Sequence, residues 1–170
     1  HLLEALPKAA ADTLHGRTIA AAAENARKLP YAAESWVNLG DAIAQGQRES
    51  ADSSCYHSHA EILYQHALKL QPLHTGAMAG MAWVYGGRHQ FDLSRLWAEK
   101  ALSLDPGNTA SHGIIGDAGV ELGDYNMAFE HYQKMMDLRP DLSSWSRGAH
   151  LLWLTGNQTR AVMLMEQAIK

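Results

Sequence analysis

Histidine and cysteine are the side chains of this 170-residue chain with the most chemical potential, and the densest group is Cys55, His57, His59 and His66. Thiolate and imidazole are zinc ligands, and together they form a nucleophile and its base. On a helix, Cys55, His59 and His66 would share a face, but His59 and His66 are seven positions apart, which is roughly 10.5 Å along the axis. Cys55 with His59 supplies only two of the ligands that zinc needs. We therefore expect no metal and no cofactor, and keep a metal-dependent sensor using the Cys55–His66 segment as an alternative.

No catalytic constellation accompanies these residues. The segment 46–59 is polar and rich in glycine and serine at its start, so it predicts a lengthened turn and not a preformed site with an oxyanion hole. No G-x-S-x-G occurs, and Gly86-Gly87 follows a helical stretch without the lysine of a phosphate-binding loop. We predict that the chain is not an enzyme. The segment 46–59 is either a lid or partner-contact loop, or a product of neutral drift at the surface.

The amino-acid composition and net charge argue against nucleic acids and membranes as partners. Hydrophobic residues make up 46% of the chain and charged residues 19%, which is typical of a globular protein. The net charge of −4 argues against a nucleic-acid partner, and no apolar run approaches the length of a membrane span. Cys55 is the single cysteine, which leaves the compartment open; we expect a soluble protein and lean toward the cytoplasm. The chain begins at His1 without a signal-peptide pattern, and we expect a fragment of a longer protein.

Four prolines divide the chain into units that must position any functional residue. Pro72, Pro106 and Pro140 are 34 residues apart, and Pro30 precedes Pro72 by 42. Each follows an amphipathic stretch, which a proline terminates. Between the prolines, apolar residues recur at three-to-four spacing and the pattern breaks once, for example at residues 122–125. Alternating apolar residues are absent, so we predict stacked helix–turn–helix units and no strands.

The units resemble the tetratricopeptide repeat, a 34-residue helical hairpin with the pattern W-x2-L-G-x2-Y…A-x3-F…P. Trp36, Leu39 and Gly40 match the opening of the motif, whereas Gly119 stands where the third unit should have tyrosine. Small residues recur at the matching place on each second helix; they are Ala60, Ser94, Ala128 and Ala161. The resemblance implies an all-α, right-handed α-solenoid of stacked hairpins.

The register predicts a domain organisation. Residues 1–29 form an N-terminal helical segment that packs as a partial repeat or cap, and residues 30–170 form four repeats. The repeats cover residues 33–74 (with the insertion near 46–59), 75–108, 109–141 and 142–170. The apolar face of the final helix has no covering unit and no polar cap follows it, so we expect either a continuing parent chain or self-association at this end.

The resemblance also implies a function. In the family, the first helix of each unit lines a concave groove that binds extended or helical peptides. We therefore expect a non-catalytic scaffold for a protein or peptide partner, with acidic groove residues favouring basic groups on that partner. The candidate groove residues are Asp41, Trp83, Asp117, Glu121, His150 and Trp153. For Trp83 and Trp153, burial between units is an equal alternative to groove exposure.

Two other binding modes of related proteins are not expected. The basic clamp that some members use for carboxyl-terminal tails is absent, because its positions hold Val37, Ala79, Gly80 and Ile114, with Asn38 and Arg147 as isolated remnants. The chain also lacks the basic stripe of related repeats that read RNA. A structural alternative remains, in which exposed repeat ends drive homo-oligomerisation.

Overall fold

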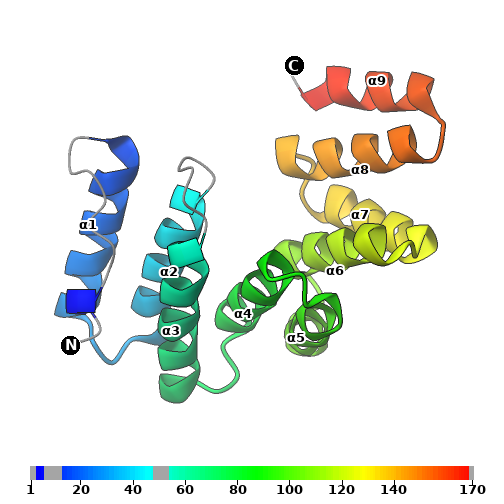
Figure 1. Cartoon of the computed structure of the whole chain (residues 1–170). Helices are drawn as coiled ribbons and strands as arrows, with labels where there is room; N and C mark the ends of the chain where they lie inside the picture. Colours follow the sequence, from blue (N-terminus) through cyan, green and yellow to red (C-terminus); the bar gives the residue numbers. More distant parts are fainter. Residues whose placement is uncertain (1–2, 6–12, 48–53, 169–170) are drawn as a thin grey trace.

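All regular structure in the described part of the chain, residues 3–5, 13–47 and 54–168 of this computed structural model, is helical. After a short 3-10 helix, η1 (Leu3–Ala5), the chain forms antiparallel helical hairpins that follow an arc (Figure 1). The α-helices in these residues are α1 (Leu14–Lys28), α2 (Ala33–Gln47), α3 (Ser54–Leu70), α4 (Thr75–Gly87), α5 (Phe91–Leu104), α6 (Thr109–Leu122), α7 (Tyr125–Leu138), α8 (Leu142–Leu154) and α9 (Gln158–Ala168). The predicted all-α solenoid is confirmed.

Prolines and caps set the helix ends. The helices α1, α3, α5 and α7 each end two residues before a proline, because proline disfavours helical geometry in the residue that precedes it. Within the third hairpin, Gly123 closes α6 with a φ of 76°, in the left-handed region that glycine adopts without strain. Asp124 then caps α7, where its carboxylate accepts a hydrogen bond of 3.0 Å from the Met127 amide.

Small residues allow the helices to approach closely. Ala60, Ser94, Ala128 and Ala161 are all buried where the hairpin helices cross, as the repeat pattern predicts. Ser94 also donates a 2.8 Å hydrogen bond to the carbonyl of Ala82 on α4, so its hydroxyl is satisfied inside the core.

The solenoid has an inner layer of first helices. The helices α2, α4, α6 and α8 contact one another in series, and the second helices α3, α5 and α7 each pack between the first helices of their own unit and the next. The largest buried cluster joins α1 to α4 and includes Trp36, whose indole nitrogen donates to the Pro30 carbonyl at 2.8 Å. Because the inner helices lie closer together than the outer ones, the stack curves and its inner face is concave (Figure 1).

The segment 46–59 differs from the lengthened turn that the sequence predicts. Residues 46–47 complete α2 and residues 54–59 already belong to α3, so the segment lengthens two helices at its ends. Its remaining residues, and with them the idea of a lid, lie outside the described residues. The side chain of Cys55 is likewise outside them.

Candidate functional site: the concave groove

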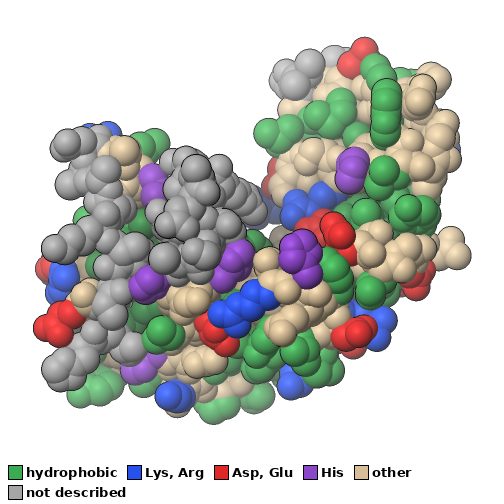
Figure 2. All heavy atoms as spheres, in the orientation of Figure 1, with side chains coloured by type: hydrophobic (Ala, Val, Ile, Leu, Met, Phe, Trp, Pro, Cys, Tyr) green, Lys and Arg blue, Asp and Glu red, His purple; other side chains and the backbone are tan. Residues whose placement is uncertain are grey.

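Two adjoining cavities hollow the concave face. They measure about 370 Å³ and about 320 Å³, and Trp83 and Ile114 belong to the walls of both. The floor of the first cavity is made by residues with little or no side chain, namely Gly76, Ala79, Gly80, Ala110 and Gly113 of α4 and α6. In the space-filling view, acidic, basic and histidine side chains gather around the hollow between the two arms of the arc (Figure 2). Cavities of this size accept a side chain or a short stretch of peptide.

Five of the six candidate groove residues line these two cavities. Asp41 lies in the wall of the first; Asp117, Glu121 and His150 line the second; Trp83 is half-buried and reaches both. Trp153 is placed differently. Its side chain is 54% exposed and belongs to a separate, almost wholly apolar hollow between α8 and α9.

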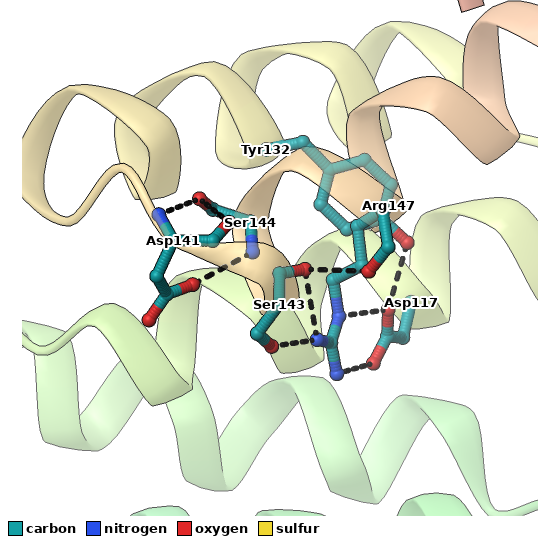
Figure 3. A network of polar contacts seen from close by, with 7 residues as sticks. Asp117, Tyr132, Asp141, Ser143, Ser144 and Arg147 are labelled. Carbon is teal, nitrogen blue, oxygen red and sulfur yellow. Dashed lines mark hydrogen bonds and ion pairs between the residues drawn. The ribbon is translucent and has the colours of Figure 1, made fainter. Parts of the chain in front are cut away.

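Asp117 sits at the centre of a polar network (Figure 3). Arg147 of α8 binds its carboxylate in a bidentate manner, from Nε to Oδ1 at 2.8 Å and from Nη2 to Oδ2 at 2.9 Å. The hydroxyl of Tyr132 donates to Oδ1 at 2.7 Å, and burial together with the Asp117 charge raises the pKa of that tyrosine. Such charge-assisted, forked pairs are the stronger class of hydrogen bond. The network ties α6, α7 and α8 together.

This network changes the role expected of Asp117. The sequence marks it as an acid that faces a basic partner, but its charge is already compensated by Arg147 and both of its oxygens accept hydrogen bonds. A partner cation would have to displace an intramolecular guanidinium to reach it. Asp117 therefore acts as a structural residue of the groove wall, and Asp41 and Glu121 are left as the acids that face the cavities.

Asp41 has the same tyrosine partner but a different environment. The hydroxyl of Tyr64 donates to its Oδ1 at 2.8 Å. Among the described residues, no arginine or lysine forms an ion pair with it. The crowded groove wall raises the pKa of the Asp41 carboxyl mainly by desolvation, and the nearby charge of Glu34 adds to this effect. Asp41 thus presents a partly desolvated carboxylate to the first cavity.

Two histidines of α3 pack against tryptophan rings. The ring of His57 lies 4.8 Å from that of Trp83, and His66 meets the indole of Trp36 edge-on at 4.5 Å. Burial lowers the pKa of His66, with a smaller contribution from the Lys69 charge. Within the described residues, no three histidine, cysteine, aspartate or glutamate side chains are grouped so as to hold a metal ion.

A pair of histidines, His112 and His131, joins α6 to α7. Nε2 of His112 lies 3.1 Å from the Pro106 carbonyl, which can only accept, so this nitrogen carries the proton. Nδ1 of His112 must then accept from Nδ1 of His131, 3.0 Å away. Burial lowers the pKa of His131, and the neighbouring His112 and Lys134 lower it further.

Several residues that shape the groove were not among those selected from the sequence. The most important is Arg147, which the sequence pattern indicates only as an isolated remnant of a basic clamp. It lies 34 residues beyond Gly113 and 68 beyond Ala79, both floor residues of the first cavity, so the repeat register itself marks its position. The loop residue Asn108 also lines this cavity, while its side chain caps α6 by accepting from the Ser111 amide at 2.9 Å.

The fold and the groove define a helical-repeat solenoid, and comparison with known families specifies the repeat. Residues 110–142 match the family model of the tetratricopeptide repeat. This match covers α6 and α7, the hairpin that carries Asp117 and Tyr132. The resemblance predicted from the sequence is confirmed, because residues 110–142 match this repeat.

Solved structures share the fold. One is MamA (residues 41 to the end) from Desulfovibrio magneticus RS-1, with 18% identity and a TM-score of 0.62 over 91% of this chain and 84% of that one. Another is the APC/C hetero-tetramer Cut9–Hcn1, with 15% identity and a TM-score of 0.74 over 92% of this chain and 29% of that one. At these identities the likeness concerns the fold alone. No curated protein matches the chain in sequence.

Neither comparison points to an enzyme family. In the described part of the chain, no helix combines the length and the apolar character that crossing a membrane would require.

Proposed function

We propose that this protein is a non-catalytic scaffold whose concave groove binds a peptide segment of a protein partner. The observation that carries the proposal is the pair of adjoining cavities along the inner helices, joined at Trp83 and Ile114. Tetratricopeptide repeats are interaction modules, which supports the general class.

The groove offers three features to a peptide. Its floor of glycine and alanine leaves room for a main chain to approach the helices. Trp83 supplies a half-buried aromatic surface, the kind of residue that dominates binding energy at interfaces. Asp41 and Glu121 add negative charge, which favours basic groups on the partner and raises the rate of association. A single short peptide with such contacts should bind with a dissociation constant on the order of micromolar.

The test is selection of peptides from a random display library on the intact protein, followed by binding measurements on a groove-blocked variant. Ala110→Trp fills the first cavity from an exposed position and leaves the core intact. Ala21→Trp, on an exposed position of α1 outside the groove, is the matched control. Asp117→Lys is a poor choice for this purpose, because it would break the pair with Arg147 and confound binding with folding.

The proposal expects peptides that bind wild type and Ala21→Trp equally and lose at least tenfold in affinity on Ala110→Trp. Peptides that bind all three proteins equally would place recognition elsewhere and contradict the groove as the binding site.

A second candidate function, self-assembly, is favoured by the apolar end of the solenoid. Trp153, Val162 and Met165 line a hollow of about 600 Å³ between α8 and α9, and all three are exposed. Exposed apolar surface of this kind marks contact sites. Light scattering over a hundredfold concentration range decides the matter: a rising mass that Val162→Lys abolishes supports self-assembly, and a constant monomer mass excludes it.

A further inference from the structure

We propose that the cavity beside Asp41 receives an arginine side chain of the partner, in the place that Arg147 occupies at Asp117. The inference rests on the proposed peptide-binding function and specifies the chemistry of the residue that is bound. Its basis is a comparison of two equivalent sites within the same chain.

The two sites share their fixed parts. In each, a tyrosine of the second helix donates to Oδ1 of an aspartate on the first helix: Tyr64 to Asp41 at 2.8 Å, and Tyr132 to Asp117 at 2.7 Å. In each, the residue before the aspartate is a glycine whose missing side chain makes room for that tyrosine ring; these are Gly40 and Gly116. The tyrosine therefore holds each carboxylate in a matching orientation, and one oxygen, Oδ2, is left for another donor.

The sites differ in what fills the remaining space. At Asp117, the guanidinium of Arg147 arrives from the next first helix and binds both oxygens. The position equivalent to Arg147 beside Asp41 is Ala79, which is short and lines the open cavity of about 370 Å³. The groove thus keeps the carboxylate and its tyrosine at Asp41, whereas Ala79 supplies no cation at the position where Arg147 does.

Among the described residues, no arginine or lysine that lines the first cavity pairs with Asp41. Two arginines line this cavity, and both are paired with other acids: Arg139 with Asp141 at 2.7 Å, and Arg147 with Asp117. Within the described residues, the hydrogen bond that Asp41 accepts comes from the Tyr64 hydroxyl. A cation that enters the cavity can therefore give the partly desolvated Asp41 carboxylate the charge-assisted hydrogen bonds that Arg147 gives to Asp117.

Arginine fits this site better than lysine. The geometry at Asp117 uses two guanidinium nitrogens on two carboxylate oxygens, which an ammonium group cannot reproduce. Trp83 lines the same cavity and offers an aromatic face, against which a planar guanidinium stacks.

The test titrates N-acetylarginine amide into isotopically labelled protein and follows the backbone amides of Gly76, Ala79 and Gly80 and the indole of Trp83 by NMR. Neutral N-acetylcitrulline amide, which has nearly the same shape, and N-acetyllysine amide are the comparison probes. We expect the arginine probe to shift these signals with millimolar affinity, at least tenfold tighter than citrulline and several-fold tighter than lysine. Asp41→Asn should weaken the arginine probe at least fivefold, and Asp137→Asn, an exposed acid outside the groove, should not change its affinity.

A second variant supplies the arginine side chain from the protein itself. Ala79→Arg should recreate at Asp41 the pair seen at Asp117, so that the arginine probe no longer shifts the groove signals. The inference is overturned if arginine and citrulline probes behave alike, if no groove signal moves, or if Asp41→Asn and Asp137→Asn have the same effect. Those results leave the proposed function standing as long as selected peptides remain sensitive to Ala110→Trp; loss of that sensitivity is what would defeat the proposed function itself.

Discussion

At the scale of single residues, two tyrosine–aspartate hydrogen bonds hold carboxylates on the inner surface of the solenoid. Arg147 neutralises Asp117 and, together with Tyr132, joins three helices, whereas Asp41 has Tyr64 as its hydrogen-bond partner among the described residues. The same motif thus serves stability at one end of the groove and, in our proposal, recognition at the other. The difference comes from one position of the repeat, which holds Arg147 in α8 and Ala79 in α4.

Removal of the guanidinium should reveal its structural role. Arg147→Ala leaves Asp117, half-buried between α6 and α8, with Tyr132 alone, and we expect a loss of about 1–3 kcal/mol in the free energy of unfolding. Arg95→Ala is the control, because Arg95 forms an exposed pair with Glu99 within one helix and should cost less than about 0.5 kcal/mol. Urea denaturation measures both; equal losses would show that the Asp117 network does not tie the helices together.

The histidine pair predicts a dependence of stability on pH. Because the pKa of His131 is lowered in the folded protein, the unfolded chain binds more protons between the folded pKa and the ordinary value of 6.5. Stability should therefore be complete above pH 6.5 and fall as the solution is acidified through that window. Urea midpoints between pH 5 and 7.5 should fall less steeply in His131→Gln than in wild type. Parallel curves for the two proteins would contradict the assignment.

At the scale of helices, glycines decide how closely neighbouring units pack. A Cβ added at Gly80 would lie 2.5 Å from two ring atoms of Tyr64, which is itself fully buried. Alanine would gain helix propensity of about 1 kcal/mol, but we expect the clash to prevail. The small residue at this position is therefore required by the aromatic ring that fills the space between α2 and α4.

Gly80→Ala should accordingly destabilise the protein by about 1–3 kcal/mol. Gly86→Ala on the same helix is a matched comparison, because its new methyl group would meet the Ser94 hydroxyl at 3.2 Å and should cost much less. Thermal unfolding of the two variants checks this order. A Gly80→Ala variant as stable as Gly86→Ala would show that Tyr64 can move aside.

The periodicity of the sequence was sufficient to predict the helices but not the polar side-chain contacts between them. Prolines at the repeat boundaries and alanines at the crossings report backbone geometry directly, so hairpins and helix ends could be predicted. The pair between Asp117 and Arg147 spans 30 residues, and the contact of His112 with His131 depends on rotamers that no periodicity encodes. The start of α3 at Ser54 was missed because polar composition was interpreted as a turn.

For the whole molecule, curvature converts separate helix pairs into one binding surface. The inner helices bring Asp41 of α2 and His150 of α8 to two adjoining cavities, although more than a hundred positions separate these residues in the sequence. No single repeat contains the groove. The function we propose therefore belongs to the stack as a whole, while its specificity rests on the few positions where the repeats differ.

The most direct test of the groove is amide hydrogen exchange of the protein with and without a selected peptide. Our account predicts that bound peptide slows exchange most in α4 and α6, whose residues form the cavity floor, and less in α5 and α7 on the outer layer. Slower exchange confined to α5, α7 or α9 would show that the partner binds the convex face or the end of the solenoid, and would contradict the concave groove as the binding site.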